Sequence, residues 1–359
     1  MKKIICVLGV LLLSLSSLEL SAQDPHFSQF FANPLYLNPA FAGTNVCPRV
    51  TAHFRDQWPN VHGTYLTYSA SYDQHFDKLA GGIGVLFMGD HQGQGTINTY
   101  AASVIYSYKL KVSRKFSMRF ALQATFQQKS LNWDKLTFGD MIDPKYGFVY
   151  ETNETAPSKQ SKAIADFSAG FIGYTKNFYF GLAVNHVTRP YEGFISVSRL
   201  PVKWTAHAGG LFDLKRRSRK SHSFGDVSIS PNIIYQHQME FHQLNYGLYV
   251  NYYPFVVGIW YRQSFRNPDA VIFMFGLQHD LVRIGYSYDL TVSKLANLSG
   301  GAHEVSLQLL LPCPERTYTV SHQILMLGAD IGIETLPYLA KGTPGLLPDI
   351  GDDLLPLPK

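Results

Sequence analysis

Three groups of residues in this sequence have types and spacings that could support chemistry. His237, Glu240 and His242 combine ring nitrogens with a carboxylate, and such sets can bind zinc. The stretch from Gly89 to Thr96 has the glycine content of a phosphate-binding loop. Thirteen histidines and many serines could in principle supply a Ser/His or Asp/His pair for hydrolysis. Each possibility depends on the elements that would position these residues.

The expected positions of these residues disfavour all three kinds of site. His237, Glu240 and His242 fall on an expected external hairpin, where polar residues are ordinary. The 89–96 stretch lacks the Gly-Lys-Ser/Thr ending and joins two expected strands, so a turn is the better interpretation. No motif places a nucleophile beside a base and an orienting group. We therefore expect no catalytic residue, cofactor or metal ion, and we expect that the protein is not an enzyme.

Apolar and polar side chains alternate over long segments of the chain. From Phe116 to Gln127, apolar residues alternate with polar ones such as Arg119 and Gln123. Because strand side chains point to opposite faces with a period of two, one face can meet lipid while the other meets water. Membrane-barrel strands need about nine to eleven residues, whereas globular strands usually have about five or six. The segment length therefore favours a membrane barrel over a β-sandwich.

Charged residues keep to one parity in these segments. Arg49 and Arg55 alternate with Val50 and Phe54, and a charge facing lipid at mid-bilayer would cost roughly 2 to 4 kcal/mol. This parity indicates a water-lined lumen. We expect an all-β, transmembrane antiparallel barrel of about fourteen strands with periplasmic termini. The expected strands are 49–57, 63–76, 81–89, 96–110, 115–128, 163–173, 178–186, 201–214, 224–237, 242–252, 255–263, 270–279, 281–290 and 303–311.

Composition and the first residues agree with an exported barrel. Charged residues make up 16% of the chain, against about 25% typically, and aromatic residues reach 14%. Lys2 and Lys3, the apolar run 4–13 and the small residues up to Ala22 predict a signal peptide over 1–22. The net charge of +5 is mild, and the basic clusters lie in expected turns. A nucleic-acid partner is therefore not expected.

Specific motifs begin directly after the expected signal peptide. Residues 23–43 read Gln-Asp-Pro-His-Phe-Ser-Gln-Phe-Phe-Ala-Asn-Pro-Leu-Tyr-Leu-Asn-Pro-Ala-Phe-Ala-Gly. Further motifs lie at 54–59, 82–96, 185–190 and 285–293. From about residue 23 to 313 the chain resembles the PorP/SprF family of the type IX secretion system of Bacteroidota. Residues 314–359 depart from the family pattern, because they extend past its expected end.

The resemblance implies an outer-membrane component of type IX secretion and gliding motility, in one of two roles. Such a protein would bind, help export or anchor the C-terminal domain of a secreted surface adhesin, or it would dock to the periplasmic lipoprotein ring of the secretion system. The other partner is outer-membrane lipid. A passive diffusion channel is the alternative function, and residues 23–44 separate the two because a porin does not need such a segment.

The chain divides into four parts: a signal peptide (1–22), an N-terminal segment (23–46), the barrel (47–313) and a Pro/Leu-rich periplasmic tail (314–359). The N-terminal segment is too apolar for a free tail, while Pro34 and Pro39 prevent a long helix or strand. We expect it to pack in or against the lumen. The side chains expected to pack there are Phe27, Phe30, Phe31, Leu35, Tyr36, Leu37 and Phe41.

Cys47 and Cys313 bracket the barrel in an oxidising compartment, and the first and last strands of a closed barrel are neighbours. They form a candidate disulfide, which requires Cα atoms within about 7 Å; two free thiols are the alternative.

The tail has prolines that prevent a long helix or regular strand, so we expect an extended segment that becomes ordered on a periplasmic partner. A terminus without function is the alternative. The candidate docking residues are Leu346, Leu347, Asp349, Asp352, Asp353, Leu354 and Leu355.

Overall fold

The computed structural model describes residues 23–45, 47–61, 63, 65–93, 95–194, 197–215, 226–265, 268–279, 281–292 and 299–312. These residues include most of the N-terminal segment and all strands from Arg49 to Leu310. The expected signal peptide, Cys313 and the whole expected docking tail lie outside them.

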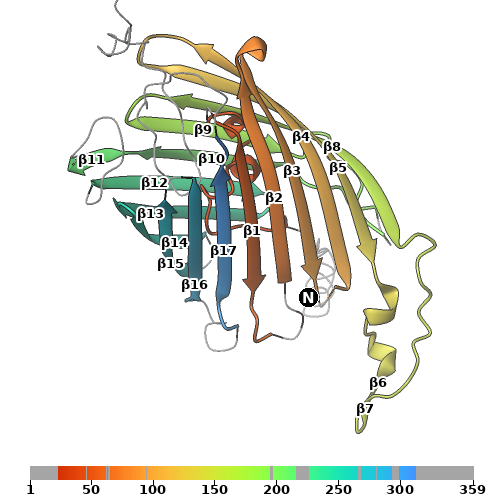
Figure 1. Ribbon diagram of the computed structural model, residues 1–359. Helices are drawn as coiled ribbons and strands as arrows, with labels where there is room; N and C mark the ends of the chain where they lie inside the picture. The colour runs from red at the N-terminus through yellow and green to blue at the C-terminus, as the bar shows by residue number, and fades with distance from the viewer. Residues whose placement is uncertain are drawn as a thin grey trace, which may run out of the picture.

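The strands close into a single antiparallel barrel (Figure 1). Each strand pairs with its neighbours in the sequence, and β1 pairs with β17 from Arg49 opposite Leu310 to Gln57 opposite Ala302. The sheet has 15 strands, but β10 and β11 are two parts of one interrupted strand, so the wall has fourteen. The all-β barrel that the sequence predicted is confirmed.

The strands of the wall are β1 (Arg49–Gln57), β2 (Tyr65–Phe76), β3 (Gly81–Gln92), β4 (Ile97–Lys111), β5 (Ser117–Leu131), β8 (Ser161–Tyr174), β9 (Phe178–Asn185), β10 (Lys203–Gly210), β11 (Phe212–Lys215), β12 (Val227–Gln238), β13 (Phe241–Tyr252), β14 (Phe255–Ser264), β15 (Pro268–His279), β16 (Val282–Thr291) and β17 (Ala302–Leu310).

One expected strand differs from the structure. The sequence predicted an unbroken strand over 201–214, whereas the observed strand stops at Gly210 and resumes at Phe212. Gly209 and Gly210 directly precede the interruption. Glycine weakens a strand interior and often marks a bulge or bend, which gives the physical reason for the break.

The outer face of the wall is apolar. Leu122 is 71% exposed and Val104 is 61% exposed, although both lie in the middle of long strands. On the opposite face, Arg49, Arg55 and Arg119 are buried. This is the parity that the sequence predicted, with apolar side chains directed to lipid and charged ones inward. None of the described helices is long and apolar enough to cross a membrane.

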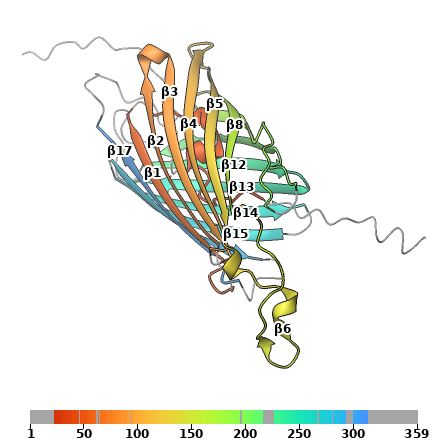
Figure 2. The same cartoon turned by 90° about the vertical axis from the view of Figure 1, so that its right-hand side faces the viewer.

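The two ends of the barrel differ in their connections. At one end, β5 and β8 are joined by a long excursion that lies beyond the strand ends (Figures 1 and 2). At the other end the described turns are short, as at Thr175–Asn177 and Tyr253–Pro254. Because barrels of this type have short periplasmic turns and longer external loops, we assign the excursion to the outer end. Its elements are η3 (Trp133–Lys135), η4 (Gly139–Met141), β6 (Ile142–Asp143) and β7 (Gly147–Phe148).

Candidate functional site

Residues 23–45 lie inside the barrel and form what we call the plug. Pro34 begins a short helix, α2 (Pro34–Leu37), and Pro39 begins a 3-10 turn, η1 (Pro39–Phe41). Proline suits the first helical position because it has no N–H to satisfy there. Asn38 separates the two turns, and its side chain accepts a hydrogen bond from the Ala40 N–H at 2.9 Å. The plug is therefore a compact folded piece.

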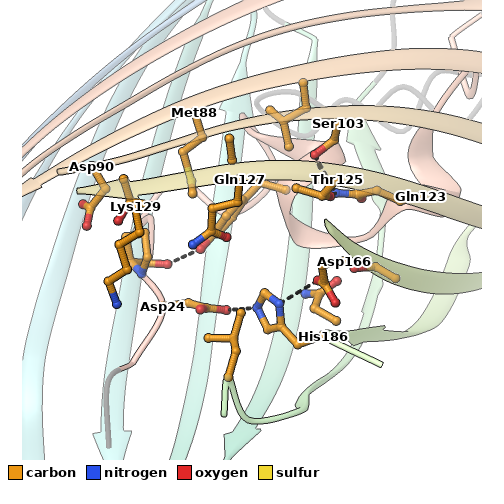
Figure 3. Close-up of a pocket in the computed structure, with 18 of the residues that line it drawn as sticks. Asp24, Met88, Asp90, Ser103, Gln123, Thr125, Gln127, Lys129, Asp166 and His186 are labelled. Atoms are coloured by element: carbon orange, nitrogen blue, oxygen red, sulfur yellow. Dashed lines mark hydrogen bonds and ion pairs between the residues drawn. The ribbon is translucent and has the colours of Figure 1, made fainter. Parts of the chain in front are cut away.

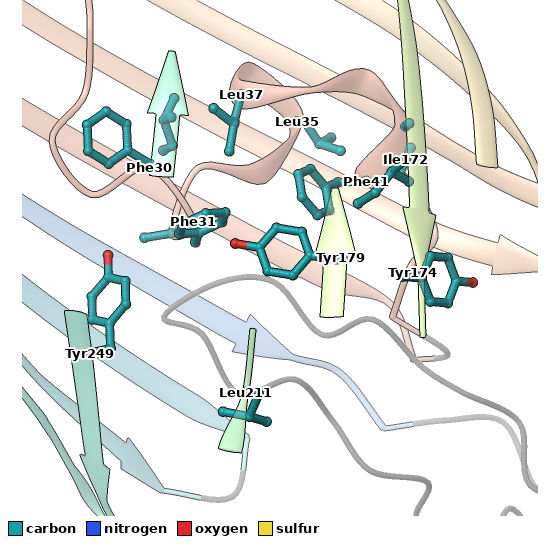
Figure 4. Close-up of a cluster of buried hydrophobic side chains, with 14 of the residues drawn as sticks. Phe30, Phe31, Leu35, Leu37, Phe41, Ile172, Tyr174, Tyr179, Leu211 and Tyr249 are labelled. Atoms are coloured by element: carbon teal, nitrogen blue, oxygen red, sulfur yellow. The ribbon is translucent and has the colours of Figure 1, made fainter. Parts of the chain in front are cut away.

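The apolar side chains of the plug fill the lumen between opposite walls (Figure 4). Phe31 packs edge-on against Tyr179 of β9 at 5.8 Å between ring centroids, and Phe30 lies 5.1 Å from Trp260 of β14. Tyr36 is half-buried. The other six residues that the sequence singled out are buried: Phe27, Phe30, Phe31, Leu35, Leu37 and Phe41.

This packing corrects one expectation from the sequence. The parity of charge indicated a water-lined lumen, but Arg49 and Arg55 are almost completely buried. Arg49 donates to the Phe41 carbonyl, and Arg55 donates to Ser28. Much of the inner face therefore contacts the plug, because the polar groups of a folded segment can take the place of water.

Glu304 of β17 holds one end of the plug. It is 0% exposed and accepts hydrogen bonds from the backbone N–H of Ser28 at 2.7 Å and of Gln29 at 3.2 Å. Arg55 of β1 donates to the same carboxylate at 3.2 Å. A buried carboxylate with several charge-assisted donors forms strong, directional hydrogen bonds.

Asp289 of β16 extends this network along the same side of the wall. Its carboxylate accepts from the Ser28 hydroxyl at 2.5 Å and from Arg55 at 2.9 Å. Arg262 of β14 donates to Asp289 at 3.0 Å and to the Ser28 hydroxyl at 2.6 Å. Two arginines therefore face two carboxylates around one plug serine, and the buried charges are paired.

The other end of the plug meets the wall through its backbone. Gly43 donates to Asp73 at 2.8 Å, and Arg119 donates to the Gly43 carbonyl at 2.6 Å. A Cβ on Gly43 would lie 2.5 Å from the Cα of Gly82, and its φ of +63° is left-handed. Only glycine fits this close approach without strain.

Asn38 joins the middle of the plug to the opposite wall. Its amide donates to the carbonyls of Phe171 and Leu182, at 3.0 and 3.1 Å, and lies 3.0 Å from His207 Nε2. Contacts at both ends and in the middle therefore attach the plug around the lumen.

The first residues of the plug are held by a clasp of three side chains. His186, directly after β9, lies 2.7 Å from Asp24 and 2.8 Å from Asp166 of β8. Burial opposes the charge on His186, but Asp24 and Asp166 outweigh it and raise its pKa to about 9. Burial would likewise raise the pKa of Asp24, yet His186, Lys203 and a hydrogen bond from Gln238 hold it well below its usual range. The clasp is an ion pair at neutral pH.

The clasp fixes residues 23–25 at the end of the barrel that we assign to the cell exterior. His186 belongs to the connection between β9 and β10, and Lys203 is the first residue of β10, so both lie at that end. The sequence predicted periplasmic termini, and β1 begins and β17 ends at the opposite end of the barrel, which we assign to the periplasm. The plug runs through the lumen between Gly43, near that end, and Asp24 at the outer end.

The clasp predicts a loosening at high pH. The pKa of His186 is raised above its unfolded value of about 6.5, so its contribution is complete below that pH and lost as pH rises through about 9. The contribution of Asp24 to stability has the opposite pH dependence. Because its pKa is lowered, this contribution is present above about pH 4 and lost in stronger acid.

Hydrogen exchange tests the high-pH loosening of the clasp: exchange of residues 23–26 should accelerate between pH 8 and 10. In His186→Gln this acceleration beyond the intrinsic rate should be absent.

A cavity of about 90 Å³ lies between the plug and the wall (Figure 3). Asp24 and Tyr36 of the plug bound one side, and Asp90 and Gln127 of the wall bound the other. Most of its wall residues lie near the outer ends of β3, β4, β5, β8 and β9. The cavity is partly open, and its lining combines amide, hydroxyl and carboxylate groups with apolar side chains such as Leu35, Leu86 and Met88.

A family model for the type IX secretion system membrane protein PorP/SprF matches residues 19–309. The chain belongs to the PorP/SprF family. It is an outer-membrane protein with a barrel wall, and the coarse role that follows from the family is type IX secretion.

Solved structures with a similar barrel have very different sequences. The toluene transporter TbuX of Ralstonia pickettii is 10% identical, with 77% of this chain and 93% of that chain covered and a TM-score of 0.45. The outer membrane protein Omp33 of Acinetobacter baumannii is 8% identical, with 75% and 100% covered and a TM-score of 0.41. No curated protein matches this PorP/SprF chain in sequence.

His237 and His242, which the sequence raised as possible metal ligands, lie on the β12–β13 hairpin, as predicted. His237 and His242 face each other across the β12–β13 hairpin, with ring centroids 4.3 Å apart. The Tyr235 hydroxyl and His242 Nδ1 are 2.8 Å apart. Among the described residues of this PorP/SprF protein, no group of three or more His, Cys, Asp or Glu could hold a metal ion.

The seam of the barrel carries the candidate disulfide. Cys47 is disulfide-bonded, and Cys313 lies outside the described residues, so their pairing stays a prediction. The Leu311 N–H donates to the Pro48 carbonyl at 2.9 Å, which brings the residues after β17 beside Cys47. Thiol labelling of the unreduced, unfolded mature protein should modify no cysteine. Labelling of two cysteines per chain would disprove the bond, and Cys47→Ser should expose one thiol.

Proposed function

We propose that this PorP/SprF protein is a closed docking component of type IX secretion. In this proposal it is not an enzyme, and it binds an exported surface protein, such as an adhesin, at the outer end of the barrel. Its periplasmic side contacts the secretion ring. The plug is the observation that carries the proposal, because it occupies the space that a channel would leave for solute.

The contacts of the plug favour closure over passive diffusion. Plug groups bond to side chains or carbonyls of β1, β2, β4, β5, β8, β9, β10, β14, β16 and β17, which surround most of the lumen. Each buried polar contact would have to be broken to open a path, and a buried donor or acceptor left unpaired costs about 1 to 3 kcal/mol. A diffusion channel would have no use for so many contacts.

The excursion between β5 and β8 supports docking at the cell surface. Its tip exposes Tyr146 by 69% and Phe148 by 62%, and Val149 is also exposed. Asp143 orders this tip, because its carboxylate accepts from the N–H groups of Lys145 and Tyr146 at 2.8 and 2.9 Å. Exposed apolar groups on an ordered loop are typical of an interaction site.

The charge around this tip indicates which partner it suits. Residues 132–154 carry five acidic and two basic side chains. An acidic rim is repelled by anionic lipid headgroups and attracts a protein with a basic rim. This supports an exported protein rather than the lipid surface as the occupant.

Purification from native membranes tests the proposed function. Mass spectrometry of the co-purified proteins should recover a secreted adhesin or a component of the periplasmic ring. The variant Tyr146→Ser/Phe148→Ser should lose the adhesin but retain the ring, and Lys159→Ser in the same excursion is the matched control. Recovery of neither class of partner, together with single-channel conductance of the intact protein, would favour the diffusion channel.

The tail predicts a separate effect on the periplasmic partner. Deleting residues 337–359 should leave the barrel inserted and heat-stable, because the described wall ends with β17. The same deletion should weaken recovery of the ring component, since we propose that Leu346, Leu347, Leu354 and Leu355 become ordered on it. Unchanged recovery of the ring and unchanged adhesin display would show that the tail has no docking role.

A further inference from the structure

We propose that the cavity between the plug and β3, β4, β5, β8 and β9 binds a primary amine or guanidinium group, such as the side chain of a basic residue of an exported polypeptide. This inference rests on the proposed function for the source of the ligand. The cavity chemistry alone defines the ligand class. The decisive group is Asp90 of β3.

Asp90 is a buried carboxylate whose hydrogen-bond partners are all neutral. It is 3% exposed and lines the cavity. It accepts from the Thr67 hydroxyl at 2.7 Å and from the Gln92 amide at 2.7 Å. It forms no ion pair within the described part of the chain. Buried charges are normally paired, so a carboxylate without a cation beside an open space indicates a position for one.

The other acids of the cavity already have cationic partners. Glu192 lies 2.8 Å from Lys129, and Asp24 and Asp166 share protonated His186. These pairs leave Asp90, which is labelled in Figure 3, as the lining carboxylate with no ion pair among the described residues.

The sum of charges around the cavity is negative. Among the described lining residues, four carboxylates stand against two cations, which leaves two negative charges. Lys203 lies outside the lining, and its Nζ is 3.7 Å from the Asp24 carboxylate. If Lys203 is included, the net charge is still negative by one. The potential inside a concave, low-dielectric site of this sign favours a positive ligand.

The remaining lining suits an organic cation rather than a metal ion. Gln123, Gln127 and Thr99 offer neutral hydrogen-bonding groups. The half-buried ring of Tyr36, which already has Lys203 Nζ 5.1 Å from its centroid, adds apolar surface. The described acids do not gather into a group that could hold a metal ion. Amide acceptors and an aromatic ring bind the N–H groups and the stem of a lysine or arginine side chain.

Binding of N-acetyl-lysine amide to the purified full-length protein in detergent tests this assignment. Titration calorimetry or ligand-observed NMR should detect the amine, while its side-chain-acetylated analogue and N-acetyl-glutamate amide should bind at least tenfold more weakly. Asp90→Asn keeps the shape but removes the charge, and should weaken binding of the amine at least tenfold. Asp213→Asn, at an exposed position of β11 outside both the cavity and the excursion, is the matched control and should leave binding unchanged.

A second variant keeps the test decisive if Asp90→Asn fails to fold. Gln127→Glu adds a negative charge to the lining and should tighten binding of the amine several-fold. The assignment is overturned if the amine does not bind, if the neutral analogue binds equally, if Mg²⁺ or Ca²⁺ displaces it, or if neither substitution changes its affinity. Because no partner protein is present, this experiment can fail while adhesin or ring recovery succeeds, and the reverse.

Discussion

Replacing Glu304 with glutamine should lower the free energy of unfolding of the barrel by about 3 to 5 kcal/mol, the usual cost of removing one partner from a buried ion pair. Glu304 accepts two backbone N–H groups of the plug and lies 3.2 Å from Arg55. The substitution leaves Arg55 with Asp289 alone and turns one oxygen acceptor into an amide donor. The midpoint of denaturant unfolding in detergent should fall, and protease should trim residues 23–44 faster.

Asp134→Asn is the control for this experiment, because it removes one charge from an exposed position. It should change neither the midpoint nor the trimming rate. If Glu304→Gln matched the control in both measurements, the plug would not be held by the Glu304 contacts. A lower midpoint without faster trimming would assign Glu304 to the wall alone.

Deleting residues 23–44 should convert the closed barrel into a conducting one. The aromatic and aliphatic side chains that fill the lumen would be gone, and a fourteen-strand wall lies in the size range between filled small barrels and open porins. In planar bilayers, the intact protein should show almost no single-channel conductance, and the deletion variant should show steps resembling those of a porin.

A disulfide that ties the plug to the wall provides the comparison for this deletion. Asn33 and Ser69 have side-chain atoms 2.8 Å apart, so Asn33→Cys/Ser69→Cys can join the plug to β2. The oxidised variant should stay silent, and the reduced variant should match the intact protein. Equal conductance from the intact and deleted proteins would contradict a plugged lumen.

Much of the wall could be predicted because it depends on a local rule. The alternation around Arg119 and Leu122 places one side chain inside and the other toward lipid, whatever the rest of the chain does. Strand ends agreed within a few residues at most positions, as for β1 at 49–57. The break at Leu211 was missed, although the preceding Gly209 and Gly210 carried a signal for it.

The candidate site could be predicted only in outline. Apolar residues such as Phe31 and Phe41 indicated burial, but nothing local shows that Ser28 meets Glu304, which is 276 residues away. The cavity around Asp90 was missed for the same reason. The alternation in β3 predicts that the Asp90 carboxylate points inward. Whether a cation lies beside it depends on how five strands and the plug come together, and among the described residues none does.

The depth at which the plug lies also constrains the order of assembly. Ser28 contacts β16 and β17, the last strands to be synthesised, while Gly43 contacts β2, one of the first. A folded plug held by contacts around the wall cannot be threaded into a cylinder that is already sealed. The plug must therefore either lie in the lumen before β1 pairs with β17, or enter the closed barrel as an unfolded chain that folds against the wall.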